Sequence, residues 1–181
     1  VAPREAVAQE SPRDTSYRRV LLWVIALAVL GFGSLMTLVT AALPSIAADM
    51  NTTTTTAAWV LTGLMLAMAV GTPAGGKLGD IYGHRNTFLI GLVGMTATMF
   101  ANYWVWNIGA FIAVRVLFGL SGALLMPSGM ALLMDAFGAE ERAKAVGWFQ
   151  FAMTGAPTLG VVLGGPLLDL LGWRSIFVGL G

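Results

Sequence analysis

Long apolar runs dominate this chain, and polar residues gather between them. Crossing about 30 Å of hydrocarbon takes about 20 apolar residues in a helix, because backbone polar groups in lipid must hydrogen-bond internally. Five runs reach that length, and a sixth begins at Trp173, too near the end of the sequence to cross a bilayer. The predicted spans cover residues 20–43, 57–76, 87–106, 108–134 and 145–168. We therefore expect an all-α membrane protein with five complete transmembrane helices and the start of a sixth, the N-terminal part of a longer chain.

Composition supports a membrane protein and excludes several other classes. Hydrophobic residues make up 57% of the 181 residues and charged residues 10%, with a mean hydropathy of +0.79, whereas soluble domains are roughly 25% charged. The net charge of +1 leaves no basic patch for nucleic acid. With no cysteine and one histidine, disulfides and a metal centre are not expected. No phosphate-binding loop or nucleophilic constellation occurs, so neither a cofactor nor an enzymatic activity is predicted.

Basic residues between the spans predict the orientation. Residues 1–19 mix arginines, acids and prolines and are expected to form a flexible tail. Four basic residues lie in this tail and two in each loop that follows spans 2 and 4, against Arg174 alone on the other side. Because cytoplasmic loops are enriched in Lys and Arg, we expect a multi-pass protein of the cell (plasma) membrane with a cytoplasmic N-terminus. Residues 51–56 then lie outside, where the threonines are expected to cap the second span.

An internal repeat relates the two parts of the chain. Residues 75–85 align with residues 164–174, sharing Gly, Gly, Leu, Asp, Gly and Arg at six of eleven positions, with an offset of 89 residues. This offset covers three spans, so the two copies end on opposite sides of the membrane. Inverted repeats are typical of secondary transporters. The alternative is that two glycine-rich helix ends with an Asp cap resemble one another by chance.

The first copy carries a specific motif. The segment Gly75-Gly76-Lys77-Leu78-Gly79-Asp80-Ile81-Tyr82-Gly83-His84-Arg85-Asn86 resembles the signature loop between spans 2 and 3 of the major facilitator superfamily. Its glycines are expected to let another helix approach closely, with Asp80 and Gly83 forming a tight turn. The resemblance implies a conformational latch made of Gly76, Gly79, Asp80, Gly83 and Arg85. The alternative for Asp80 and Arg85 is a helix cap and a topology signal.

Span 5 resembles the antiporter motif of the same family. Its small residues follow the family spacing at Gly147, Gly160, Gly164 and Gly165, although Ala156 and Val161 replace a Gly and a Pro. The resemblance implies a flexible, closely packed helix between two halves of a transporter. Ordinary small-residue packing is the alternative.

One charge lies inside a span. Arg115 in span 4 is a functional candidate because an ionisable group in hydrocarbon is costly. Similar family members have an Arg here that is implicated in proton coupling, but Phe118 replaces their following Gln. Snorkelling of Arg115 to the outer interface is the competing explanation.

The end of span 1 resembles the fourteen-span drug/proton antiporter branch. Residues 38–46 keep the Ala-Leu-Pro ending of that motif, but Leu35 and Thr40 stand where the branch has Asp and Asn. Proton coupling is therefore in doubt, and protons remain only a candidate partner beside the lipid bilayer, a small-molecule substrate and the missing C-terminal half.

The sequence thus predicts an inverted three-helix repeat from a major facilitator transporter that exports small molecules or drugs by alternating access. A non-transporting membrane scaffold or degenerate gene product is the alternative, motivated by the replaced motif residues. Neither the substrate nor the oligomeric state follows from the sequence.

Overall fold

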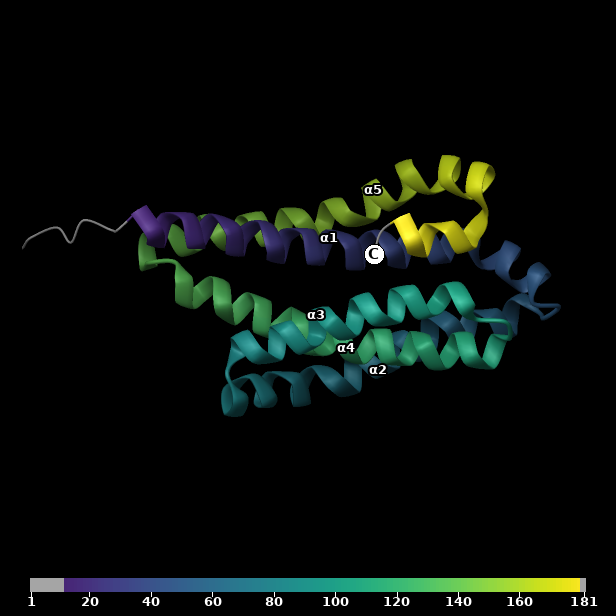
Figure 1. Cartoon of the computed structure of the whole chain (residues 1–181), viewed down its shortest axis with the longest axis horizontal. Coiled ribbons are helices and arrows are strands. Elements are labelled where there is room, and N and C mark those ends of the chain that lie inside the picture. The colour runs from purple at the N-terminus through teal and green to yellow at the C-terminus, as the bar shows by residue number, and fades with distance from the viewer. Residues whose placement is uncertain (1–11, 180–181) are drawn as a thin grey trace, which may run out of the picture.

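The structure of the chain, a computed structural model, describes residues 12–179, and the side chains of residues 17–138, 141–162 and 173. The described residues form five α-helices and one short 3-10 helix (Figure 1). Their bounds are α1 Pro12–Asp49, α2 Thr54–Tyr82, α3 His84–Ala101, η1 Asn102–Trp104, α4 Ile108–Ala136 and α5 Ala139–Gly179.

Polar side chains fix two helix starts at the same end of the molecule. Thr53 is the N-cap of α2, and its hydroxyl accepts a hydrogen bond from the backbone N–H of Thr56 at 3.2 Å. Asn107 caps α4 in the same way, accepting from the N–H of Ala110 at 2.7 Å. Each cap satisfies one of the backbone donors left open in a first helical turn. The predicted threonine cap of span 2 is confirmed.

Several boundaries differ from those expected. α1 begins at Pro12, so residues 12–19 of the expected flexible tail are helical. Residues 1–11 lie outside the described part of the chain. The second helix extends past residue 76 to Tyr82, and the third ends at Ala101, five residues before the predicted end at 106. Helical structure in α5 continues through residues 168–173, where the sequence suggests a break, but its yellow C-terminal part turns back in Figure 1.

Two parallel helix pairs make up most of the structure. α1 packs along α5, and α2 packs along α4, with α3 against α4 (Figure 1). In the inverted repeat α1 corresponds to α4 and α2 corresponds to α5. The α1–α5 pair is therefore equivalent to the α4–α2 pair. α2 and α5 run in opposite directions, as the inversion requires (Figure 1). The packing has the symmetry that the sequence repeat predicts.

Two close helix contacts are related by the same offset of 89 residues. A Cβ placed on Gly71 would lie 2.9 Å from the Cβ of Ala123 in α4. A Cβ on Gly160 would lie 2.7 Å from the backbone oxygen of Ser34 in α1. Gly160 is 89 residues after Gly71, and Ala123 is 89 residues after Ser34, the offset of the aligned motifs. The two small-residue seams are therefore equivalent in three dimensions, and chance similarity of two helix ends does not explain them.

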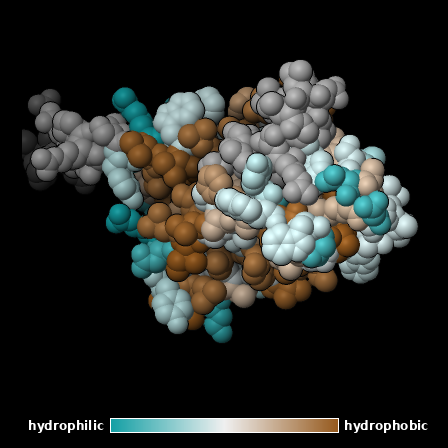
Figure 2. Space-filling model, turned by 45° about the vertical axis from the view of Figure 1, so that its right-hand side comes forward, coloured by the Kyte–Doolittle hydropathy of each residue, from teal (hydrophilic) through white to brown (hydrophobic). Residues whose placement is uncertain are grey.

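The surface and the helix lengths fit a bilayer. Figure 2 shows apolar residues over the middle of the visible face and hydrophilic residues toward its two ends. Among the described residues, three helical segments are long and apolar enough to span a membrane by themselves: Tyr17–Asp49, Thr54–Tyr82 and Ile108–Ala136. α3 has 18 residues, and its first turn contains His84, Arg85 and Asn86. α5 has side chains that are described only in part.

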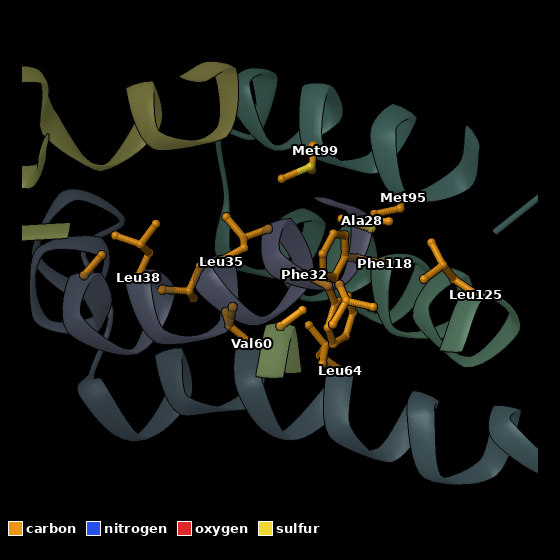
Figure 3. Packing of buried hydrophobic residues seen from close by; sticks show 14 of the residues in the cluster. Ala28, Phe32, Leu35, Leu38, Val60, Leu64, Met95, Met99, Phe118 and Leu125 are labelled. Carbon is orange, nitrogen blue, oxygen red and sulfur yellow. The ribbon is translucent and has the colours of Figure 1, made fainter. Parts of the chain in front are cut away.

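The core lies where α1 crosses α4. The rings of Phe32 and Phe118 stack with centroids 5.1 Å apart and nearly parallel planes (Figure 3). Leu35, Leu64 and Leu125 extend this cluster and are fully buried. Leu35 occupies the position at which the fourteen-span branch has an acid, so an apolar contact replaces a titratable group at the centre of the bundle.

Candidate functional site

The loop between α2 and α3 consists of one non-helical residue. Gly83 has φ +86° and ψ 133°, a conformation that residues with a Cβ rarely adopt. The hydroxyl of Thr87 donates to the carbonyl of Gly83 at 3.2 Å, and the side-chain amide of Asn86 donates to the carbonyl of Tyr82 at 3.2 Å. The signature segment is thus a rigid corner between two helices. Asp80 lies in the last turn of α2, so the turn itself is made by Gly83.

Glycines of the signature segment differ in what they touch. A Cβ on Gly75 would collide with the backbone oxygen of Ala123, and one on Gly79 would lie 2.5 Å from Nδ1 of His84 and 3.3 Å from the hydroxyl of Ser128. These two glycines permit the close approach that was expected. Gly76 has nothing within 4 Å of its Cβ position, so the expected helix contact at Gly76 is absent within the described structure.

The charges of this corner face outward. The side chain of Asp80 is 76% exposed, and its Oδ1 lies 3.5 Å from Nε2 of His84 four residues later. Lys77 and Arg85 are exposed at the same end of the molecule. Since the carboxylate contacts only one edge of a histidine, most of its surface is accessible to a further partner.

Arg115 is fully buried about two turns from the start of α4. Its guanidinium carbon lies 5.2 Å from the ring centroid of Phe111 and 5.4 Å from that of Phe118. Such placement between two aromatic faces is a cation–π arrangement, worth about 2 kcal/mol when desolvated. Arg115 does not reach the surface, so the snorkelling alternative is wrong. Phe118, which replaces the family Gln, supplies one of these two faces.

Small residues of α5 pack against α1. A Cβ on Gly33 would lie 2.5 Å from the Cβ of Ala156, and the hydroxyl of Ser34 donates to the carbonyl of Ala156 at 3.0 Å. Gly160 meets Ser34 in the next turn, whereas Gly147 has no neighbour within 4 Å of its Cβ position. The surroundings of Gly164 and Gly165 lie outside the described residues. The antiporter-like segment therefore forms a close helix contact at Ala156 and Gly160.

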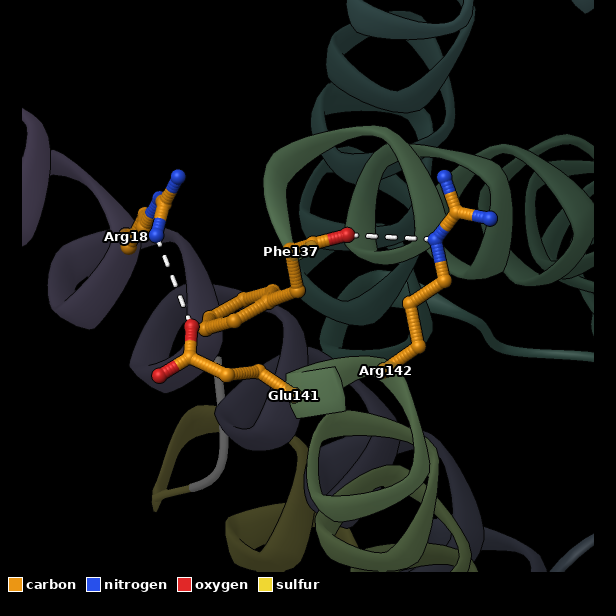
Figure 4. Close-up of polar contacts among 4 residues, drawn as sticks. All are labelled: Arg18, Phe137, Glu141 and Arg142. Carbon is orange, nitrogen blue, oxygen red and sulfur yellow. Dashed lines mark hydrogen bonds and ion pairs between the residues drawn. The ribbon is translucent and has the colours of Figure 1, made fainter. Parts of the chain in front are cut away.

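The sequence analysis did not identify Gly33 and Ser34, which contact α5, or a group of polar contacts near the α4–α5 connection. Arg18 of α1 forms an ion pair with Glu141 of α5 at 3.5 Å, and its guanidinium lies 5.8 Å from the ring of Phe137. Nε of Arg142 donates to the carbonyl of Phe137 at 3.1 Å (Figure 4) and to that of Met134 at 2.9 Å. Cations commonly bind the open carbonyls at a helix C-terminus. Arg142, which follows the end of α4 by a few residues, carried that signal in the sequence.

Among the residues whose side chains the structure describes, each carboxylate lies near a helix end. Asp49 ends α1, Asp80 lies in the last turn of α2, Asp135 lies near the end of α4 and Glu141 near the start of α5. Thr40 is exposed, and its hydroxyl donates to the carbonyl of Met36 at 2.8 Å. Among the described side chains Arg115 is the buried charge, and no group of three or more His, Cys, Asp or Glu there could hold a metal ion.

Comparison with known proteins agrees with this geometry. The chain matches the Major Facilitator Superfamily over residues 21–181, and it belongs to that family. It is 34% identical over 156 residues to the tetracenomycin C resistance and export protein of Streptomyces glaucescens, covering 86% of this chain and 29% of that protein. It is 33% identical to the multidrug efflux pump LfrA of Mycolicibacterium smegmatis, covering 88% of this chain and 32% of the pump. The chain therefore spans about a third of the length of these relatives.

The solved structures show the same fold. The proton:xylose symporter XylE bound to 6-bromo-6-deoxy-D-glucose matches with a TM-score of 0.78 at 18% identity, covering 92% of this chain and 42% of the symporter. An inward-open structure of XylE from E. coli matches with a TM-score of 0.75 at 17% identity, covering 91% of this chain and 45% of that one. The five helices correspond to the N-terminal part of a major facilitator fold.

Proposed function

We propose that this chain is the N-terminal part of a secondary transporter that exports small molecules by alternating access. The repeated contact between Gly71 and Ala123 and between Gly160 and Ser34 carries the proposal, because inverted repeats of this kind rock about a site at their interface. The relatives described as export proteins and efflux pumps support the direction and the cargo class. The missing C-terminal half supplies the second element of the rocking pair.

The basic end of the molecule faces the cytoplasm in this proposal. Arg18, Lys77, Arg85 and Arg142 all lie at the end where α1 begins and where the α2–α3 and α4–α5 connections turn (Figure 1). The positive-inside rule then places Asn51 and Asn107 outside, in a plasma membrane. The N-terminus and the signature corner share the cytoplasmic side.

The signature corner acts as a latch for the cytoplasmic-closed arrangement. Asp80 is mostly exposed, and the rigid turn at Gly83 fixes its position relative to the end of α2. Because a carboxylate is stabilised at a helix N-terminus, Asp80 is suited to bind such an end in the other half of the transporter. Gly79 keeps α2 close to Ser128 of α4, so the latch moves with the bundle.

Arg115 is the candidate coupling residue, with the antiporter-like seam as the hinge surface. The carboxylates among the described side chains lie near helix ends, and in this proposal a proton-titrating carboxylate is supplied by another part of the full-length transporter. A buried guanidinium fixed by Phe111 and Phe118 would then set the electrostatic field in which that carboxylate titrates.

A transport assay tests the proposal. The full-length protein that contains this chain is reconstituted in proteoliposomes, and flux of the fluorescent dye ethidium is measured with no ATP and then with an imposed proton gradient. Dye movement without ATP supports a secondary transporter, and its acceleration by the gradient supports an antiporter. The anionic dye 1-anilinonaphthalene-8-sulfonate is assayed in the same way, and absence of flux of both the cationic and the anionic dye under both conditions, with protein correctly inserted, would favour the non-transporting scaffold.

A further inference from the structure

A hollow opens between α1, α4 and α5 near the cytoplasmic end of the bundle. Its volume is about 180 Å³. An apolar cavity of roughly 150 Å³ suffices for one benzene molecule, so this hollow has room for a single aromatic ring. The lining residues are Arg19, Leu22, Trp23, Ile25, Ala26, Leu133, Trp148 and Phe149.

The inverted repeat explains why the hollow exists. Adding the offset of 89 to Leu22 and Ala26 gives Phe111 and Arg115, so the hollow corresponds to the buried arginine site at the other end. There a planar guanidinium lies 5.2 and 5.4 Å from the rings of Phe111 and Phe118. At the cytoplasmic end the two counterparts, Leu22 and Ala26, have smaller side chains and line the hollow.

The chemistry of the walls selects a class of ligand. Trp23 and Trp148 are 68% and 62% exposed, and with Phe149 they present aromatic surface to the hollow. Among the described lining side chains, Arg19 is the one that carries a charge. Aromatic faces stack well on a flat ring, and the guanidinium of Arg19 attracts an acidic group on that ring and repels a cation.

A second, shallower hollow shares Trp148 and repeats the arrangement. It is lined by Lys144, Gly147, Trp148 and Phe151. Lys144 precedes Trp148 by four residues, as Arg19 precedes Trp23, and α1 and α5 are parallel (Figure 1). Each cation therefore lies about one turn closer to the cytoplasm than its tryptophan.

We propose that the hollow between α1, α4 and α5 binds one aromatic ring of a planar cargo that is uncharged or anionic, with Arg19 pairing with an acidic group at its rim. The inference rests on the proposed export function, because it assigns the class of the exported molecule. The acyl chain of an anionic phospholipid is the competing occupant, and the experiment separates the two.

Two probes that differ by one group test the proposal. Binding of 1-anilinonaphthalene-8-sulfonate and of N-phenyl-1-naphthylamine, which has the same rings without the sulfonate, is titrated by fluorescence. The full-length protein is held in phosphatidylcholine nanodiscs, and empty nanodiscs are subtracted. Ala26→Phe fills the hollow and is expected to weaken both probes at least about tenfold. Val24→Phe, a smaller increase in bulk on the neighbouring face of α1, is the control for an added aromatic ring and should leave both unchanged.

The charge is tested separately from the space. Arg19→Gln is expected to weaken the sulfonate about fivefold and the neutral probe less than about twofold, because only the sulfonate loses a charge-assisted contact. Arg19→Lys should restore most of the sulfonate affinity. Trp148→Leu, at an exposed position, should weaken both probes and is the second variant should Ala26→Phe reduce the yield of folded protein.

Contrary outcomes are well defined. Equal affinities for the Ala26→Phe and Val24→Phe proteins, or unchanged affinities after Trp148→Leu, overturn the proposal. Loss of binding of the neutral probe, N-phenyl-1-naphthylamine, to the unmodified protein when phosphatidylglycerol replaces part of the phosphatidylcholine overturns it in favour of the lipid, because the negative surface repels only the sulfonate. Transport by the full-length protein distinguishes failure of this inference from failure of the export function. Dye flux by the unmodified protein, together with unaltered probe binding in the variants, would refute the binding site in the hollow and leave the export function standing. If the variants change probe binding as expected but the unmodified protein transports no dye, the export function is refuted and the binding site stands.

Discussion

At the scale of single residues, the glycines of the signature corner are not equivalent. Gly75 and Gly76 are neighbours in sequence, but Gly75 faces the backbone of α4 at Ala123 and Gly76 faces open space. A backbone oxygen cannot move aside as a flexible side chain can, so added bulk at Gly75 must separate the two helices.

We therefore expect Gly75→Ala to destabilise the protein by about 1–3 kcal/mol. Gly76→Ala is the matched control, and it should be neutral or stabilising by up to about 1 kcal/mol because alanine favours a helix interior. Thermal unfolding in detergent, followed by tryptophan fluorescence, measures both. A similar loss of stability for the two proteins would show that the α2–α4 contact is misplaced.

Asp80 is expected to act in turnover and not in folding. Its carboxylate is mostly exposed and, among the described residues, pairs with His84, so Asp80→Asn removes a charge with little effect on packing. If the carboxylate latches the two halves, transport by the full-length protein should fall at least about tenfold at equal surface abundance, because a charge-assisted contact is worth more than about 1.4 kcal/mol.

Asp135→Asn removes a similarly exposed carboxylate near the end of α4 and provides the control. Its transport rate should stay close to that of the unmodified protein. Equal rates for the Asp80→Asn and unmodified proteins would refute the latch.

At the scale of helices, the contact between α1 and α5 at Gly33 has room for a single methyl group, that of Ala156. A Cβ on Gly33 would lie 2.5 Å from the Cβ of Ala156, so Gly33→Ala places two methyl groups in the space of one. We expect this change to destabilise the protein by about 1–3 kcal/mol.

The double variant Gly33→Ala/Ala156→Gly moves the methyl group from α5 to α1 and should recover much of the lost stability. Unfolding of the four proteins gives the coupling energy of the pair, expected at about 0.5–3 kcal/mol. Gly160→Ala offers a contrast, because its nearest neighbour is the backbone oxygen of Ser34 and no side-chain truncation can relieve it. Additive effects of the two changes at Gly33 and Ala156 would contradict the close contact.

At the scale of the whole molecule, the inverted arrangement requires that equivalent residues face opposite compartments. Asp80 and Asp169 are equivalent by the offset of 89, and the helices that carry them, α2 and α5, run in opposite directions (Figure 1). In a cysteine-free full-length protein, Asp80→Cys should react with an impermeant maleimide only from the cytoplasm and Asp169→Cys only from outside. Labelling of both from one side would refute the inverted repeat and the orientation together.

The sequence by itself determined the membrane class, the family and the repeat. Apolar runs long enough to cross hydrocarbon, basic residues in alternate loops and two copies of one motif are all local patterns, readable without tertiary contacts. The helix ends were predicted less accurately than the spans. Residues before Val20 and after Gly76 belong to α1 and α2. Apolar runs mark only the part of a helix that lies in lipid, and polar residues beyond that part can continue the same helix.

Only the tertiary structure decided which small residues form contacts and where space remains. Gly75 and Gly76 look alike in sequence and differ in what lies opposite, while Gly33 and Ser34 became identifiable as partners of α5 only once the helices were paired. The same holds for the hollow beside Ala26, which depends on side chains from three helices. The physical reason is that packing depends on residues far apart in the chain, whereas insertion into lipid depends on each segment by itself.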